Sequence, residues 1–132
     1  MTRAAIQTDA APAAIGPYSQ AIRAGELIFT AGQVGLDPTT KALAEGVPAQ
    51  ARQAIANLAA ILEAAGSGLD RVVKTTIFLA DIADFAGVNE AYGAAFSQPY
   101  PARSTFAVRS LPMGALVEIE CVALAAEPAG AS

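Results

Sequence analysis

The sequence predicts an α+β domain in which a mixed β-sheet carries two helices packed on one face. Three observations support this fold class. At 132 residues the chain can bury a substantial core, and residues 1–132 are expected to form one domain. Two segments place apolar residues at helical spacing, and a β-prone segment separates them. Further strand-like segments lie before the first helix and after the second, an order typical of α+β proteins.

A rigid turn precedes the first strands. Gly16 permits an unusual backbone angle and Pro17 restricts the next one, so Tyr18 is expected on a stiff loop. The Tyr18 ring has two interpretations. It is either an ordinary loop aromatic that packs over the edge of the core, or a ring that closes over a ligand and offers one hydroxyl group.

Residues 19–23 and 27–34 are expected to be strands joined by a turn. Gly32 has no side chain, which lets another group approach the backbone closely. A first helix is expected from Pro48, which suits the first helical position, to Gly66, which ends it. The apolar stripe of this helix is assigned to the core and comprises Ala51, Ile55, Leu58, Leu62 and Ala65. The polar residues expected to lie away from this stripe are Arg52, Gln53, Asn57 and Glu63.

Residues 71–79 are apolar on both faces and rich in β-branched residues, which predicts a central strand covered on both sides. Asp81 is a candidate N-cap for the second helix, which is expected to stop at Pro99. The buried stripe expected for this helix comprises Phe85, Val88, Tyr92 and Phe96. The small and polar residues 127–132 are expected to form a loose tail.

The last two strands are expected to form a hairpin, because a short connection with Pro and Gly joins them. Alternation places Arg103 and Thr105 on one face of the first strand, and Glu118 and Glu120 on one face of the second. A turn near position 112 would set Arg103 opposite Glu120 and Thr105 opposite Glu118. A register error of two residues would exchange the carboxylates, so the expectation is that Arg103 lies near this pair.

An arginine and two carboxylates in apolar strands have two interpretations. They form a structural ion pair or part of an interface between subunits. Alternatively, they line a small pocket for an anionic substrate, because guanidinium binds a carboxylate bidentately and a half-buried Glu can hold a proton or orient a water molecule.

The composition excludes several functions. The chain has no histidine, which rules out a Ser-His-Asp triad, a Cys-His pair and imidazole-bound metal, and no metal site is expected. A net charge of −4 with scattered basic residues argues against nucleic acid as a partner. No apolar run approaches the roughly 18 residues of a membrane span, so no membrane association is expected and the cytoplasm is the expected compartment. The single cysteine, Cys121, is assigned to the core.

The amino-acid composition indicates that copies of the chain associate. Apolar residues make up 54% of the sequence and charged residues only 15%, against about 25% in ordinary globular proteins. Some apolar surface is therefore expected to be covered by another subunit, in a homo-oligomer of cyclic symmetry.

Several motifs resemble those of the RidA (YjgF/YER057c/UK114) family, in the right order and over about residues 6–124. They are Ile15-Gly16-Pro17-Tyr18-Ser19-Gln20-Ala21, Ala31-Gly32-Gln33, Pro101-Ala102-Arg103-Ser104, Leu111-Pro112 and Val117-Glu118-Ile119-Glu120. The resemblance implies a chorismate-mutase-like fold assembled as a homotrimer, with ligand sites between subunits. It also implies a deaminase that hydrolyses reactive 2-imino acids or their enamines, such as 2-iminobutanoate, 2-iminopropanoate and 2-aminoacrylate, to 2-keto acids and ammonia, without a cofactor.

The resemblance also implies roles for individual residues. Arg103 matches the arginine that grips the substrate carboxylate, and Glu118 matches the residue that positions the attacking water. Tyr18 matches the aromatic residue at the mouth of the pocket, whereas Gly32 and Thr105 match residues that contribute main-chain contacts. Glu120 remains a second candidate for the role of Glu118, because the hairpin register set it opposite Arg103.

The chain departs from the family pattern at two positions, with Ala31 where many members have Ser and Thr105 where many have Cys. These departures leave other activities open. One alternative is a non-catalytic trimer that binds small molecules or proteins, and another is a related hydrolase of enamines or carbamates. Ribonuclease activity has been attributed to relatives, but the acidic charge and the absence of histidine argue against it here.

Overall fold

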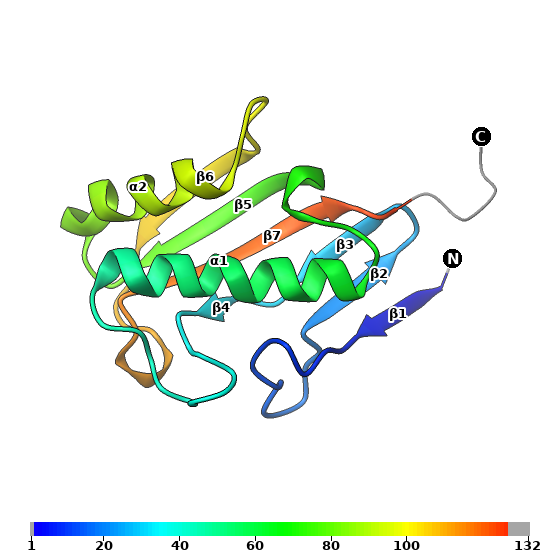
Figure 1. The fold of residues 1–132 in the computed structure, drawn as a ribbon, viewed down its shortest axis with the longest axis horizontal. Coiled ribbons are helices and arrows are strands. Elements are labelled where there is room, and N and C mark those ends of the chain that lie inside the picture. The colour runs from blue at the N-terminus through cyan, green and yellow to red at the C-terminus, as the bar shows by residue number, and fades with distance from the viewer. Residues whose placement is uncertain (1, 127–132) are drawn as a thin grey trace.

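A computed structural model describes residues 2–126 as one β-sheet with the helices α1 and α2 on the same face (Figure 1). The predicted fold class is therefore confirmed. The tail expected at residues 127–132 lies outside the described residues.

The sheet has seven strands in the order β1-β2-β3-β7-β5-β6, and β4 pairs with β7. The bounds of the strands are β1 Arg3–Ile6, β2 Ala21–Ala24, β3 Leu27–Thr30, β4 Gln33–Val34, β5 Val72–Leu79, β6 Ala102–Ala107 and β7 Val117–Leu124. Among the described strands β5 and β6 run parallel, and the other pairs are antiparallel. The sheet is thus mixed, as expected. β1 was not predicted, because its residues are mostly exposed and carry no alternating pattern.

Strand β5 lies between β6 and β7, so its central position is as predicted. The predicted cover on both faces is found only on the helix side, because no helix of the described residues lies over the other face (Figure 1). Thr75, Ile77 and Leu79 are buried under the helices, whereas the residues between them are half-buried on the other face of the sheet. The β-branched composition of β5 therefore fits a strand that is covered by a helix layer and flanked by strands on both sides.

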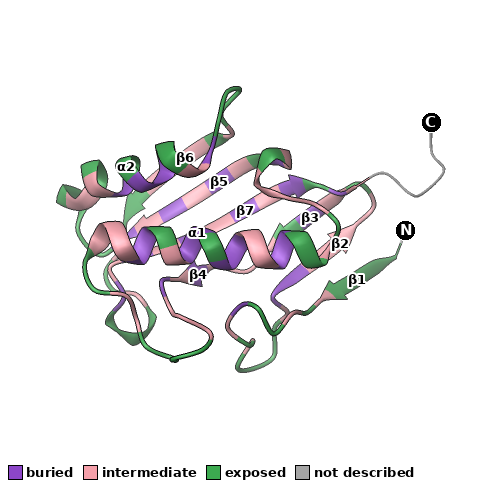
Figure 2. Cartoon of the chain, in the orientation of Figure 1, coloured by how far each residue is buried: buried purple, intermediate pink, exposed green. Residues whose placement is uncertain are grey.

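Helix α1 spans Val47–Ala64 with Pro48 in its first turn, close to the predicted bounds. Most of the predicted apolar stripe is buried, and Figure 2 shows the buried residues of α1 on one side of the helix. The prediction was wrong for Asn57, which is 1% exposed. Its amide nitrogen donates to the carbonyl oxygens of Val34 and Leu36 at 3.2 and 2.9 Å. Asn57 is buried because it satisfies the backbone of the loop that follows β4.

Helix α2 spans Phe85–Ala95 and is preceded by a 3₁₀ turn, η2, at Ile82–Asp84. Asp81 caps this turn and not α2, because its carboxylate accepts a hydrogen bond from the Ala83 amide at 2.9 Å. The predicted stripe of α2 is buried at Val88, Tyr92 and Phe96, while Phe85 remains 38% exposed.

The predicted hairpin between the last two strands is wrong. β6 pairs in parallel with β5, and β7 pairs with the opposite edge of β5, so β6 and β7 are not neighbours. The reason is the helix between β5 and β6. In a strand–helix–strand unit the helix brings the chain back to the end of the sheet at which the first strand began. The two strands therefore run in the same direction. The connection from β6 to β7, which includes the 3₁₀ turn η3 at Pro112–Gly114, then reaches across to the far side of β5.

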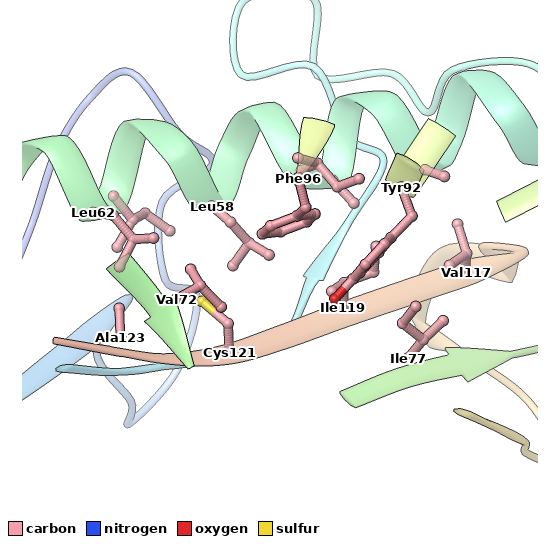
Figure 3. Close-up of a cluster of buried hydrophobic side chains, with 14 of the residues drawn as sticks. Leu58, Leu62, Val72, Ile77, Tyr92, Phe96, Val117, Ile119, Cys121 and Ala123 are labelled. Atoms are coloured by element: carbon pink, nitrogen blue, oxygen red, sulfur yellow. The ribbon is translucent and has the colours of Figure 1, made fainter. Parts of the chain in front are cut away.

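The core lies between the helix layer and the sheet. Figure 3 shows Leu58 and Leu62 of α1 above side chains of β7, with the rings of Tyr92 and Phe96 beside them. Cys121 is 3% exposed within this cluster, which confirms its assignment to the core. No helix in residues 2–126 is long and apolar enough to cross a membrane.

Candidate active site

Arg103 lies on β6, an edge strand of the sheet, and faces α2. Its guanidinium carbon is 4.9 Å from the ring centroid of Tyr92 and 5.2 Å from that of Phe85. Arg103 is directly beside Thr75 of β5 in the strand register, and the Thr75 hydroxyl is hydrogen-bonded to the Tyr92 hydroxyl at 2.8 Å. Two aromatic rings therefore hold the arginine against the helix-covered face of the sheet, and within residues 2–126 no carboxylate pairs with it.

A depression of about 340 Å³ opens beside the arginine. It is lined by Asn89, Tyr92, Gly93, Tyr100, Pro101 and Arg103. Gly93 lies in the interior of α2, and a side-chain carbon added there would meet nothing within 4 Å. The half-buried guanidinium thus borders an open space large enough for a small organic acid.

Burial raises the pKa of Tyr92 above its usual value of 10.0, while the Thr75 hydrogen bond and the nearby Arg103 charge oppose this shift. The phenol is therefore neutral at neutral pH, and its ring carries no charge that would pair with the guanidinium. Its contribution to the site is the aromatic face.

Glu118 and Glu120 project from the other face of the sheet. Arg103 aligns with Thr75, and Thr75 aligns with Cys121, whose side chain is buried under the helices. Because neighbouring residues alternate along a strand, Glu118 and Glu120 point away from that face. The expectation that Arg103 lies near this carboxylate pair is therefore wrong within one protomer. The hairpin that would have brought them together does not form.

The Glu118 side chain folds against Gly32. A side-chain carbon added at Gly32 would lie 2.7 Å from the Glu118 Oε1 atom and 2.8 Å from its carboxyl carbon. The close approach predicted at this glycine is thus made by Glu118, with β4 pairing beside it through Val34. Burial raises the pKa of Glu118 above its ordinary value of 4.5, and the charge of Glu120 adds to this shift. Glu118 therefore retains a proton more readily than a free carboxylate does.

The remaining predicted residues lie in two places. Tyr18 is 54% exposed on its loop, where its hydroxyl accepts a hydrogen bond from the Ile15 amide at 3.4 Å and its own amide donates to the Gly16 carbonyl at 2.9 Å. Thr105 lies beside Ile77 on the same face as Arg103. One protomer therefore presents two groups, Arg103 with Thr105 on the helix side and Glu118 with Gly32 on the other side.

The face that carries the two glutamates has no helix of residues 2–126 over it and exposes several large apolar side chains (Figure 1). Phe106 is 52% exposed and lies 6.4 Å from the Phe78 ring, which aligns with Glu118 in the register. Phe29 is 44% exposed and aligns with Val122. We call this surface, formed by Phe29, Phe78, Phe106, Glu118, Glu120 and Val122, the open sheet face.

Sequence reasoning missed two partners of Arg103. Phe85 and Tyr92 were assigned only to the buried stripe of α2, and Asn89 was not singled out at all. The signal was present, because residues 85 and 92 are two turns apart on one face of a helix that connects β5 to β6, the strand of Arg103. Among the described residues no three His, Cys, Asp or Glu side chains gather in a way that could hold a metal ion.

Comparisons with known proteins identify the relatives of this chain. A family model described as Endoribonuclease L-PSP matches residues 8–125. The mouse protein named 2-iminobutanoate/2-iminopropanoate deaminase is 50% identical over 123 residues, which cover 92% of this chain and 91% of the mouse protein. Reactive Intermediate Deaminase A, chloroplastic, of Arabidopsis thaliana is 52% identical over 119 residues, which cover 89% of this chain and 64% of the plant protein.

Solved structures share the fold. The crystal structure of RidA from the Antarctic bacterium Psychrobacter has a TM-score of 0.89 at 50% identity, covering 92% of this chain and 98% of that chain. The crystal structure of E. coli TdcF with bound serine has a TM-score of 0.88 at 39% identity, covering 93% of this chain and 99% of that chain. From the family model, the sequence identity and the shared fold, we conclude that this chain belongs to the Endoribonuclease L-PSP family, in which RidA and the 2-iminobutanoate/2-iminopropanoate deaminases are its relatives.

Proposed function

We propose that this protein is an imine deaminase. The proposed reaction is hydrolysis of 2-imino acids or their enamine tautomers, such as 2-iminobutanoate, 2-iminopropanoate and 2-aminoacrylate, to 2-keto acids and ammonia, without a cofactor. The observation that carries the proposal is the half-buried Arg103, held on two aromatic rings beside an open depression and paired with no carboxylate among residues 2–126. Such a guanidinium is available to a carboxylate ligand. Relatives that are about half identical are named as deaminases of this kind.

The proposed site is shared between protomers of a homotrimer. Arg103 and Glu118 project from opposite faces of one sheet, so they meet only if the open sheet face of one protomer packs beside the Arg103 edge of the next. The exposed aromatic residues of the open sheet face support such packing, because apolar patches of this kind mark interaction surfaces. The low charged fraction of 15% is consistent with this assembly.

In the proposed mechanism Arg103 binds the substrate carboxylate with two parallel hydrogen bonds and so orients the neighbouring C=N carbon. Ionised Glu118 of the adjacent protomer accepts a proton from a water molecule, whose oxygen adds to that carbon. Glu118 then delivers the proton to the nitrogen. The resulting carbinolamine transfers its hydroxyl proton to nitrogen, its C–N bond breaks, ammonia leaves and the C=O group of the 2-keto acid forms.

The other residues have supporting roles in this proposal. The exposed Tyr18 ring covers the mouth of the site, and the main chains of Gly32 and Thr105 contact the ligand. Glu120 is a second candidate for the proton acceptor, although the contact between Glu118 and Gly32 favours Glu118. The structure of E. coli TdcF with bound serine supports a small ligand that carries a carboxylate.

The test uses two variants that are each expected to be inactive alone and to restore activity when both are present in one trimer. 2-Iminobutanoate is generated in situ with a threonine dehydratase, and its loss and the release of ammonia are followed. We expect Arg103→Ala and Glu118→Gln each to leave only the uncatalysed rate. Trimers refolded from an equal mixture of the two should regain about one active site in four, because some interfaces combine the intact Arg103 of one chain with the intact Glu118 of the other.

The outcomes separate the alternatives. No recovery in the mixture would refute the shared site. Binding of 2-oxobutanoate through Arg103 without any ammonia release would indicate the non-catalytic ligand-binding protein instead, and activity only on carbamates would indicate the related hydrolase. A ribonuclease is not proposed, because the chain combines a net charge of −4 with the absence of histidine.

The cytoplasm is the proposed compartment. A single buried thiol suits a reducing environment, and one relative is chloroplastic, so fractionation of the source cells is the deciding measurement.

A further inference from the structure

The guanidinium of Arg103 is held in an unusual way for a basic residue on an edge strand. Such a side chain ordinarily extends into water or pairs with a carboxylate. Here it lies over two rings from α2, at 4.9 Å from the Tyr92 centroid and 5.2 Å from the Phe85 centroid. The two glutamates of β7, which could have neutralised it, lie on the opposite face of the sheet.

Ring contacts and ion pairs have different consequences for ligand binding. An ion pair would occupy the N–H groups that a substrate carboxylate needs. A ring holds the cation through its π face and accepts no strong hydrogen bond, so those N–H groups remain available. The aromatic contacts therefore restrict the position of Arg103 without occupying its donors.

Tyr92 is itself rigidly placed. It is 5% exposed, and its ring lies beside that of Phe96 (Figure 3), with 4.4 Å between the ring centroids. Its hydroxyl is hydrogen-bonded to the Thr75 hydroxyl at 2.8 Å. Thr75 is fully buried and sits beside Arg103 in the strand register. The strand that carries the arginine and the ring that supports its guanidinium are thus joined through one threonine. Phe85 is more exposed, at 38%, and forms the outer ring.

We propose that Phe85 and Tyr92 are positioning residues for Arg103, and that Thr75 fixes Tyr92 for this purpose. This inference rests on the proposed role of Arg103 in binding the substrate carboxylate. A guanidinium released from the rings would sample more orientations, so the carboxylate would bind more weakly. The hydrogen bonds from Arg103 to the carboxylate stabilise bound substrate and transition state alike, so the expected effect is on KM. A change at Glu118, in contrast, acts on kcat.

Four variants test the proposal. Phe85→Leu keeps an apolar side chain but removes the ring, and Phe85→Tyr restores a ring. Tyr92→Phe keeps the ring but removes its bond to Thr75. Val88→Ala is the matched control, because Val88 is a buried residue of α2, 2% exposed, whose side chain has no aromatic ring to support the guanidinium. It disturbs the packing of α2 and leaves the ring contacts intact.

We expect Phe85→Leu to raise KM for 2-iminobutanoate about tenfold with kcat within about twofold, and Tyr92→Phe to raise KM about threefold. Phe85→Tyr and Val88→Ala should both have the wild-type KM. A second measurement, calorimetric titration with 2-oxobutanoate, should give dissociation constants in the same order, and it does not depend on turnover.

The proposal is overturned if Phe85→Leu binds 2-oxobutanoate as tightly as the wild type, or if Val88→Ala weakens binding as much as Phe85→Leu. Its failure is distinguishable from failure of the proposed function. If Arg103→Ala abolishes binding of 2-oxobutanoate while Phe85→Leu does not change it, only the positioning role is refuted. If Arg103→Ala binds 2-oxobutanoate like the wild type, the proposed function and the positioning role both fall.

Discussion

Arg103 and Glu118 lie two strands apart in one sheet and project from its opposite faces, with β5 between them. A protomer therefore carries the two halves of the proposed site but cannot bring them together. The separation links activity to assembly, because each site requires the Arg103 side of one copy and the open sheet face of another.

Disrupting the open sheet face should abolish both assembly and activity. Phe106→Glu places a carboxylate on this face, next to Phe78 at 6.4 Å between the rings. Burying that charge between protomers is costly, so we expect a particle with the 13.3 kDa mass of one chain in place of a trimer, and only the uncatalysed rate of imine loss. Light scattering coupled to gel filtration gives the mass, and circular dichroism checks that the fold is kept.

The control for this variant is Ala56→Glu, because Ala56 is an exposed residue of α1 on the helix side of the sheet. It should behave as the wild type in mass and rate. A fully active Phe106→Glu monomer would contradict the shared site.

Gly32→Ala should misplace the Glu118 carboxylate. The added carbon would lie 2.7 Å from Oε1 and 3.0 Å from Cγ of Glu118, so the side chain has to rotate away. A displacement of about 1 Å in a reacting group can cost about 100-fold in rate, and we expect kcat to fall by about 10- to 100-fold. Steady-state kinetics with 2-iminobutanoate measures the change.

Gly87→Ala is the matched substitution, because its added carbon makes an ordinary contact at 3.5 Å with Val47. This variant should keep its activity and gain up to about 1 kcal/mol of unfolding free energy, since Gly is unfavourable within a helix. Equal kinetics for the two glycine variants would show that Glu118 adapts freely or plays no part.

The buried Asn57 should matter for stability more than its neighbour Gln53 on α1. Asn57→Leu removes the amide donor from the carbonyl groups of Val34 and Leu36, of which the Val34 carbonyl still accepts from the Leu36 amide at 2.8 Å. We expect a loss of about 1–3 kcal/mol in the free energy of unfolding. Urea denaturation measures it. Gln53→Ala removes only the bond from Gln53 to the Asn57 oxygen at 2.9 Å, so its effect should stay within about 1 kcal/mol. Equal free energies of unfolding for Asn57→Leu and Gln53→Ala would contradict the role assigned to Asn57.

The local features of the fold were predictable from the sequence. Helical spacing located α1 within two residues of its observed bounds, and alternation placed Arg103 and Thr105 on one face of β6. Strand pairing was not predictable in the same way, because it depends on segments far apart in the chain. The Pro and Gly residues after β6 resemble a hairpin turn. The local pattern does not show that β6 pairs with β5, to which α2 connects it, and not with β7.

The same limit applies to the site. Residue types and family motifs pointed to Arg103 and Glu118, but the geometry between them depends on which face each strand presents. A polar residue such as Asn57 is invisible to a hydrophobic pattern, because its burial follows from two carbonyl groups more than twenty residues away. Phe85 and Tyr92 were read as core residues, since periodicity does not distinguish a ring that packs on aliphatic side chains from one that supports a cation.

Cys121 should be unreactive in the folded protein. Burial raises the pKa of its thiol to about 11, so the reactive thiolate is scarce at pH 8, and the side chain is only 3% exposed. We expect no reaction with a disulfide reagent such as DTNB under native conditions and one thiol per chain in denaturant. Rapid labelling of the native protein would contradict the buried placement.

The raised pKa of Glu118 predicts how both activity and stability depend on pH. Because burial disfavours the ionised carboxylate, Glu118 keeps its proton to a higher pH than its ordinary value of 4.5. If the ionised form accepts the proton of the attacking water, kcat should fall on the acidic side with a midpoint above 4.5. Glu120→Gln removes the second cause of the shift, the charge of Glu120, and should move this midpoint down without bringing it to 4.5, since burial is the larger cause.

Protonation of Glu118 should lower kcat but stabilise the native state. The effect on stability can be measured without substrate. A carboxyl group whose pKa is raised by folding stabilises the native state below 4.5, and this contribution is lost as the pH rises through the raised value. Glu118→Gln cannot ionise, so it should be more stable than the wild type at pH 7 and equally stable below pH 4.5. Thermal melts of both proteins across this range provide the measurement. A Glu118→Gln variant that is less stable than the wild type at pH 7 would mean that the ionised carboxylate has a favourable partner in the assembled protein, and the acidic fall in kcat should then have its midpoint below 4.5.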